Sequence, residues 1–212
     1  MAQINILSNL KDDIFSVVED NQICDLRIIG QEENGLLIFT WIEEENSKEI
    51  QVVGTYDRLN KHVHILHKLE YNKNCSVIQA TINFSKSILV YVTKTSKNDN
   101  ENNSESPMFE YEVFLHCSAD GRAHTKTLDV KRPQQIMAQF LFKKKPNRQE
   151  KLLIFIHQDS VTLYQVELQE ADGIKEPVKV ALAEQVLKSF TWAQWDAGNQ
   201  CLYYIHYRKP PQ

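Results

Sequence analysis

The segment His62-Val63-His64-Ile65-Leu66-His67 holds the side chains that come nearest to a chemical site in this 212-residue chain. Imidazole nitrogens bind transition metals, and residues i and i+2 of a β-strand point to the same face. His62 and His64 could hold a metal together if a third ligand came from elsewhere, whereas we expect His67 on the opposite face. No acidic or cysteine partner lies at a diagnostic spacing. Solvent-facing histidines are therefore the favoured interpretation, and a metal-dependent enzyme is the alternative from a different class.

The sequence patterns of common enzyme classes are absent. No G-x-S-x-G, G-x-x-x-x-G-K-[ST], G-x-G-x-x-G or H-E-x-x-H occurs, and the six glycines are too scattered to form a phosphate-binding loop. No C-x-x-C pair occurs among the four cysteines, Cys24, Cys75, Cys117 and Cys201. A solvated hairpin tip accounts for the acidic run Glu43-Glu44-Glu45. We expect a non-catalytic protein with no metal and no cofactor.

Composition excludes several kinds of partner. A net charge of -4 provides no field that would gather nucleic acid. No stretch of eighteen apolar residues is present, so we expect no transmembrane segment. The first twenty residues have neither the basic nor the apolar region of a secretory signal. The N-x-S matches at Asn74, Asn83 and Asn102 are then chance matches, and a reduced, cytosolic protein is predicted.

One helix and many strands are predicted. Apolar residues at Leu7, Leu10, Ile14 and Val17 recur at helical spacing, which predicts an amphipathic helix over about 6–19 and a separate N-terminal element, 1–22. From Ile23 onward, fourteen short apolar or alternating runs are broken by polar turns, a texture typical of an all-β chain.

The strands also repeat. Similar runs begin at Ile23, Val77, Ile136 and Phe190, separated by 54, 59 and 54 residues, and each is followed by a turn and an apolar strand. A four-strand unit repeated at this spacing is typical of a β-propeller, with a β-sandwich as the alternative. Residues 23–188 would form three blades and 189–207 half of a fourth. The prediction is therefore an incomplete β-propeller-like domain of about three and a half blades over 23–212, with a disordered polar loop at 95–106.

Three and a half blades leave strand edges open. We therefore expect either a truncated isoform or fragment of a longer protein, or a chain that completes its ring with a partner. A propeller without catalytic residues is usually a binding platform. The three tryptophans, Trp41, Trp192 and Trp195, are the candidate interaction surface, and two of them are expected in the blade cores.

The block F-T-W-A-Q-W-D at 190–196, followed by a turn and L-Y-Y-I at 202–205, closely resembles a block of the γ-secretase-activating protein family, which includes the insect pigeon proteins. Weaker similarity runs through most of the chain. The resemblance implies the N-terminal propeller-like region of a longer protein that promotes amyloid-β formation through γ-secretase and the C-terminal fragment of the amyloid precursor. It also implies a cytosolic protein, peripheral at the trans-Golgi network. It assigns no functional residue to any position here, and the family's activity is attributed to a C-terminal region that this chain does not contain.

Two non-catalytic readings follow. The first is a protein-interaction module that takes part in regulating γ-secretase. The second, of the same general class, is a propeller adaptor in membrane trafficking. A truncated isoform without independent function is the remaining alternative.

Overall fold

The computed structural model describes the parts of the chain that form its strands and the turns between them. The residues described are 12, 16, 23–32, 35–83, 85–97, 108–117, 123–128, 135–141, 149–156, 160–168, 178–180, 184–188, 190–196, 199 and 201–206. These residues fall in two compact units, Met1–Val77 and Ile78–Gln212.

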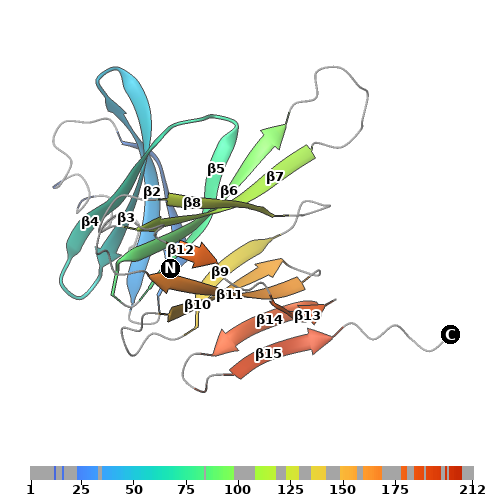
Figure 1. Ribbon diagram of the computed structural model, residues 1–212. Coiled ribbons are helices and arrows are strands. Elements are labelled where there is room, and N and C mark those ends of the chain that lie inside the picture. Colours follow the sequence, from blue (N-terminus) through green and yellow to red (C-terminus); the bar gives the residue numbers. More distant parts are fainter. Residues whose placement is uncertain are drawn as a thin grey trace. The chain divides into compact units, whose positions relative to one another are not determined.

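The described strands form four sheets in succession along the chain (Figure 1). The first sheet has the order β1 (Cys24–Gln31), β2 (Leu36–Glu45), β3 (Lys48–Asp57) and β4 (His62–Glu70). The second has the order β5 (Cys75–Ile82), β6 (Ile88–Lys97), β7 (Met108–Cys117) and β8 (Ala123–Leu128). In the third, β9 (Ile136–Phe140), β10 (Gln149–Ile156) and β11 (Ser160–Leu168) follow in order, and β12 (Val178–Val180) and β13 (Glu184–Lys188) both pair with β11. The fourth is the pair β14 (Phe190–Asp196) and β15 (Cys201–His206).

This succession confirms the predicted fold class. Among the described residues the chain is all-β, and three complete antiparallel sheets precede a pair of strands, as expected of an incomplete β-propeller-like array. Most of the predicted N-terminal helix lies outside the described residues; within it, the Ser16 N–H donates to the Asp12 carbonyl at 3.1 Å. The loop predicted over 95–106 begins later, because β6 continues to Lys97, and the rest of that loop lies outside the described residues.

The core of the first unit lies on one face of the first sheet. It consists of Leu37, Phe39, Trp41, Val52, Tyr56 and Val63. The rings of Phe39 and Trp41 stack at 5.1 Å between centroids. Residues of β2 and β3 that point to the opposite face, such as Ile38 and Val53, are also buried. Strands buried on both faces read as continuous apolar runs, which explains the sequence of β2.

A β-bulge changes the predicted direction of one histidine. In the ladder between β3 and β4, Thr55 lies opposite His64 and Val53 lies opposite His67, with a register shift between Val53 and Gly54. Directly paired residues share a face, and Val53 and Thr55 are two positions apart on β3. His67 therefore points to the same face as His64, and the prediction of the opposite face was wrong because one extra residue in β4 shifts the alternation.

The acidic run at the end of β2 is not simply a solvated hairpin tip. The Glu43 side chain is only 2% exposed, and it accepts hydrogen bonds from the Trp41 indole at 2.9 Å and from Lys68 Nζ at 3.0 Å. Lys68 also reaches Glu45 at 2.9 Å. These two carboxylates raise the pKa of Lys68, with the Glu45 hydrogen bond the larger cause and the Glu43 hydrogen bond the second. A buried carboxylate requires such partners, because burying an unpaired charge is very costly.

The core of the second unit joins the second and third sheets. Buried residues of β6 and β7 pack with buried residues of β9 and β10. A polar contact links the first strands of the two sheets: Gln79 of β5 accepts a hydrogen bond from the Ala138 N–H and donates one to the Ala138 carbonyl, both at 2.9 Å. One side chain thus satisfies both backbone groups of a residue on the edge strand β9.

Short side-chain networks hold the turns between strands. Buried Asn83 accepts hydrogen bonds from the backbone N–H groups of Ser87 and Ile88, both at 2.9 Å, and donates to the hydroxyls of Ser85 and Ser87 at 3.0 and 3.1 Å. All of the hydrogen-bonding capacity of its amide is therefore used within the β5–β6 turn.

Two other turns use an aspartate and an asparagine three residues apart. Asp57 Oδ2 accepts from Asn60 Nδ2 at 2.8 Å after β3, and Asp196 Oδ2 accepts from Asn199 Nδ2 at 2.8 Å after β14. The other carboxylate oxygen of each aspartate accepts the asparagine's backbone N–H. The D-x-x-N spacing that these two turns share is a local turn signal.

Candidate protein-interaction surface

The inner face of the fourth sheet packs within the second unit. Leu141 and Phe190 are buried there, with Ala193, Trp195 and Leu202 partly buried against them. The Trp195 indole N–H donates to the Leu141 carbonyl at 3.1 Å. These contacts fix the orientation of the β14–β15 hairpin in this unit, and they determine which side chains face outward.

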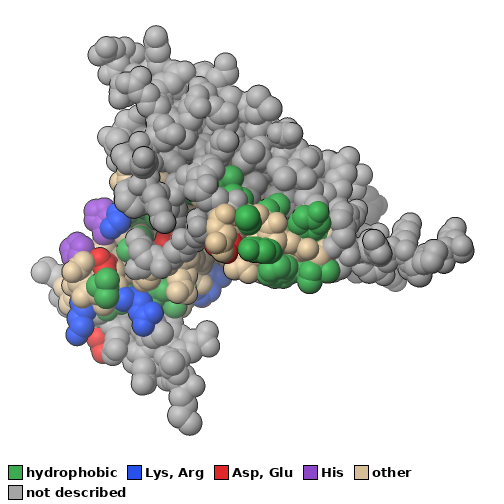
Figure 2. All heavy atoms as spheres, turned by 90° about the horizontal axis from the view of Figure 1, so that it is seen from below, with side chains coloured by type: hydrophobic (Ala, Val, Ile, Leu, Met, Phe, Trp, Pro, Cys, Tyr) green, Lys and Arg blue, Asp and Glu red, His purple; other side chains and the backbone are tan. Residues whose placement is uncertain are grey.

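The outer face of the same hairpin exposes large apolar side chains. Trp192 of β14 lies directly opposite Ile205 of β15, and Gln194 lies opposite Tyr203. Trp192 is 44% exposed, Tyr203 50% and Ile205 57%. We call Trp192, Tyr203 and Ile205 the outer aromatic face; in Figure 2, hydrophobic side chains gather where Figure 1 places β14 and β15.

The three predicted surface tryptophans have different environments. Trp41 lies in the core of the first unit with no exposed surface, so it contributes nothing to a binding surface. Trp195 is partly buried and held by its hydrogen bond to Leu141. Trp192 is exposed. The structure brings only Trp192 and Trp195 onto the same hairpin, on its two opposite faces.

Sequence reasoning missed Tyr203 and Ile205 as surface residues. The sequence did contain an indication of their exposure. L-Y-Y-I was predicted as the second strand of an incomplete blade, with no further strand to cover the pair. Trp41 was predicted as a surface residue only because it is a tryptophan, but it is buried within a complete sheet. The position of a residue within the repeat would have been a better guide than its type.

The edge position of β15 is unusual among equivalent strands. β2, β6 and β10 are each the second strand of a sheet and pair with neighbours on both sides. β15 is their counterpart in the fourth sheet, yet among the described residues it pairs with β14 alone. Its apolar sequence thus lies in a sheet that has two strands among the described residues.

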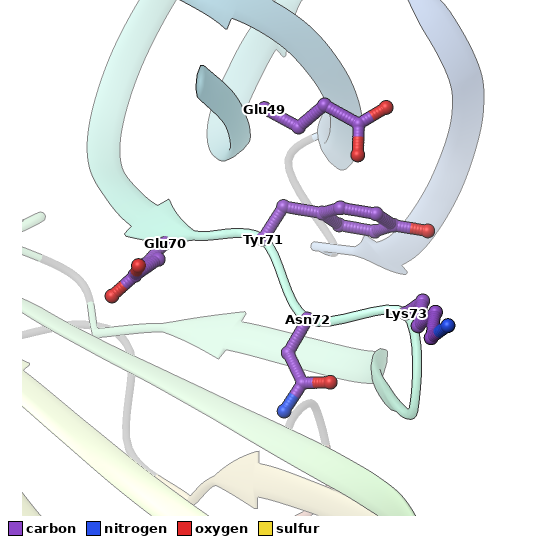
Figure 3. A pocket seen from close by; sticks show the side chains of 5 residues that line it. All are labelled: Glu49, Glu70, Tyr71, Asn72 and Lys73. Atoms are coloured by element: carbon purple, nitrogen blue, oxygen red, sulfur yellow. The ribbon is translucent and has the colours of Figure 1, made fainter.

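A shallow depression of about 550 Å³ lies at the connection after β4 (Figure 3). Glu49, Glu70, Tyr71, Asn72 and Lys73 line it. Glu49, Tyr71 and Lys73 extend toward one side of the connection, while Glu70 points away from it. Charges of both signs face solvent, and no set of groups converges on one point, so this hollow has the features of a solvated turn.

His62 and His64 are exposed on β4, which is the last strand of the first sheet. In the part of the chain that the structure describes, no group of three or more histidine, cysteine, aspartate or glutamate side chains is placed to hold a metal ion. Nor do the described residues include a helix long and apolar enough to cross a membrane.

Two curated proteins are similar to this chain over most of its length. Gamma-secretase-activating protein of Mus musculus is 25% identical over 193 residues, which cover 87% of this chain and 21% of that protein. Gamma-secretase-activating protein of Homo sapiens is 25% identical over 202 residues, covering 91% of this chain and 22% of that protein. The resemblance predicted from the aromatic block is therefore confirmed, and the chain spans about a fifth of the length of these relatives.

No protein-family model matches the sequence. Among solved structures, the β-propeller domain of Nup133 from Vanderwaltozyma polyspora is similar, with a TM-score of 0.44 and 7% identity, covering 86% of this chain and 52% of that one.

Proposed function

We propose that this chain is a non-catalytic protein-interaction module that takes part in regulating γ-secretase. The observation that carries the proposal is the 25% identity with gamma-secretase-activating protein over about nine tenths of the chain. The outer aromatic face supplies a physical means of binding, because exposed contiguous apolar groups on a rigid sheet are typical of protein contacts.

The finer form of the proposal follows the resemblance. The partners are γ-secretase and the C-terminal fragment of the amyloid precursor, and the effect is on amyloid-β formation. The place of action is the cytosolic side of the trans-Golgi network, where the chain is a peripheral protein. It needs no cofactor for this role, because binding alone is its contribution.

The outer aromatic face is the surface we assign to this contact. Trp192 and Tyr203 carry large rings with a polar edge, and such residues dominate the energy of protein interfaces. Their directly paired neighbours, Ile205 and Gln194, extend the same face. Rings held on a paired β-hairpin lose little conformational freedom when a partner binds, which favours affinity.

A capture experiment tests this proposal. The immobilised 212-residue chain is incubated with detergent-solubilised membranes, and bound γ-secretase is detected with a specific antibody. We expect capture by the natural chain and a loss of at least tenfold for the double variant Trp192→Ala, Tyr203→Ala, since each truncated hot-spot residue costs about 1–2 kcal/mol. Leu59→Ala is the matched control, because Leu59 is an exposed apolar residue on the β3–β4 turn.

Amyloid-β release from cells that express the same variants provides the functional readout. If the double variant and the Leu59 control capture equal amounts of γ-secretase, the outer aromatic face is not the surface that contacts it. No capture by any variant, with unchanged amyloid-β, would favour a trafficking adaptor or an isoform without independent function.

A further inference from the structure

The β3–β4 turn holds the most exposed large apolar side chain among the described residues. Leu59 is 87% exposed, compared with 57% or less for the side chains of the outer aromatic face. Asp57 Oδ1 accepts the backbone N–H groups of Leu59 and Asn60, at 2.9 and 3.3 Å. The leucine therefore stands at the tip of a hydrogen-bonded turn that directs it into solvent.

The hydrogen bonds of this turn require neither a leucine nor an arginine. The turn that begins at Asp196 has the same two contacts between an aspartate and an asparagine. Its two central residues are Ala197 and Gly198, where the β3–β4 turn has Arg58 and Leu59. The bulk and the positive charge at the tip of the β3–β4 turn are thus not explained by the formation of the turn.

Basic side chains surround the leucine. Arg58 and Lys61 are exposed on either side of it, and neither takes part in the ion pairs of the described residues. Arg27 and Lys68, by contrast, each pair with a carboxylate. Asp57 is the one acidic residue of the turn, and both of its carboxylate oxygens accept hydrogen bonds within the turn. The tip therefore combines one apolar side chain with two unpaired cations.

We propose that the β3–β4 turn binds an anionic lipid bilayer, with Leu59 inserted among the headgroups and Arg58 and Lys61 in contact with lipid phosphates. Basic side chains are attracted to an anionic leaflet, and apolar side chains enter the boundary between headgroups and acyl chains. This contact gives the proposed peripheral location a physical basis. It does not involve γ-secretase, so the two proposals can fail separately.

A bilayer suits this tip better than a partner protein does. A stable protein interface needs roughly 1,000 Å² of complementary surface. The exposed neighbours of Leu59, namely Arg58, Asn60 and Lys61, are polar and extend no apolar surface around it. Lipids rearrange around an inserted side chain, so a single leucine flanked by cations is sufficient for a weak contact.

The net charge of the chain does not prevent this contact. It is -4 over the whole chain, but charges are screened beyond about 8 Å at physiological salt, so the cations at the tip determine the attraction. The β1–β2 turn lies at the same end of the first sheet, because Leu36 is paired with Asp57. Glu32 of that turn is buried and does not face the membrane.

Flotation with protein-free vesicles tests the contact. The natural chain should float with vesicles of phosphatidylcholine and phosphatidylserine, and it should not float with phosphatidylcholine alone. The double variant Arg58→Ala, Leu59→Gly copies the central residues of the Asp196 turn, so we expect it to fold and to lose at least about tenfold in partition coefficient. Lys48→Ala is the matched control, because Lys48 is an exposed lysine at the opposite end of β3.

Leu59→Trp provides a second measurement, based on a gain of signal. Tryptophan is favoured at the interface between lipid and water, so this variant should bind phosphatidylserine vesicles at least as tightly as the natural chain. The fluorescence of the added indole, taken as the difference from the natural chain, should shift to shorter wavelength when vesicles are added. Added salt should release the variant and the natural chain alike, because it screens the cations.

Four results would overturn the proposal. The natural chain could fail to float, or float equally with and without phosphatidylserine. The double variant and Lys48→Ala could bind equally, or the bound Leu59→Trp variant could show no shift, and in either case another part of the chain contacts the membrane. None of these results bears on the capture of γ-secretase. Detergent-solubilised membranes present no bilayer, so Leu59→Ala remains a control in that experiment.

Discussion

Lys68 lies between two carboxylates, of which Glu43 is almost completely buried. The Lys68→Met variant removes the cation and leaves the Glu43 charge with only the Trp41 indole among the hydrogen bonds described. Breaking a fully buried pair costs about 3–5 kcal/mol, but the Lys68 side chain is 42% exposed, so water screens part of the loss. We expect a loss of about 1–2 kcal/mol in the free energy of unfolding, measured by urea denaturation.

Lys97→Met is the control for this variant. Lys97 pairs with Glu110 at 3.1 Å, but more than half of its side chain is exposed. An exposed pair contributes little, so we expect a change below about 0.5 kcal/mol. Equal losses in the two lysine variants would show that burial of Glu43 adds nothing to the Lys68 contact.

The contribution of Lys68 should also depend on pH. Its pKa in the folded chain is raised above the ordinary 10.5, by Glu45 first and Glu43 second. A raised pKa means that the folded state holds the proton more tightly, so the stabilisation is complete below pH 10.5 and is lost as pH rises through the folded value. The difference in unfolding free energy between the natural chain and Lys68→Met should stay constant from neutral pH upward and shrink only in that alkaline range.

Gly54 occupies a position where any side chain would be crowded. A Cβ atom there would lie 3.0 Å from the His64 carbonyl oxygen and 3.1 Å from the Phe39 ring. Because the first contact is with backbone, little adjustment is possible. Gly54→Ala should destabilise the chain by about 1–3 kcal/mol, the usual cost of overpacking. An unchanged midpoint of urea denaturation would show that β4 can move away.

At the scale of elements, Gln79 connects the first strands of two sheets. Gln79→Leu keeps the approximate size of the side chain but leaves the Ala138 N–H and C=O without this partner. Buried backbone groups that lose their hydrogen bonds cost about 1–3 kcal/mol each, so we expect a loss of about 2–4 kcal/mol for the pair after partial solvation. Gln139→Leu, at a half-buried glutamine of β9, is the control. Faster hydrogen exchange in β9 should accompany the loss, and a Gln79 variant as stable as the control would contradict it.

The two D-x-x-N turns should contribute similar amounts to stability. Asp57→Ala and Asp196→Ala each remove a carboxylate that accepts from both the backbone and the side chain of an asparagine. We expect a loss of about 1 kcal/mol for each variant in urea denaturation, because these bonds are exposed and water replaces them in part. Lys97→Met, which removes an exposed ion pair with Glu110, should have a smaller effect.

The strands and their repetition were predictable because both depend on local pattern. Alternation of apolar and polar residues marks a strand, and the spacing between Val77, Ile136 and Phe190 marks successive sheets. The bulge in β4 was not predictable, since an extra residue in a strand leaves no compositional sign. Burial of Glu43 was not predictable either, because its partner Lys68 is 25 positions away in the sequence.

The candidate surface was predicted only in part, for a related reason. Trp41 and Trp192 are the same residue type in strands of similar apolar character. Their exposure differs because β2 lies inside a complete sheet, whereas β14 belongs to a pair. The difference in exposure therefore depends on how many strands each sheet contains, and the type of a single residue does not predict that number.

At the scale of the whole molecule, net charge should control association between copies of the chain. The chain carries a net charge of -4 at pH 7, and its isoelectric point is close to pH 6.0. Repulsion between copies is then weakest near pH 6.0, where the net charge vanishes. Light scattering of the natural chain should therefore show the most association near that pH, and Ile205→Lys should lower it there. A maximum at a distant pH would show that association depends on particular ionised groups instead.

The hydrogen bonds of Asn83 determine whether a sugar can be attached to its side chain. It begins an Asn-Phe-Ser sequence, the acceptor pattern for sugar transfer in the endoplasmic reticulum. In the folded chain its amide nitrogen is occupied by Ser85 and Ser87 at the bottom of a turn. An oligosaccharide attached to that nitrogen would prevent these hydrogen bonds, so the sugar and the folded β5–β6 turn cannot be present together. A sugar at Asn83 would therefore mark a molecule that entered the lumen of the endoplasmic reticulum before this turn folded.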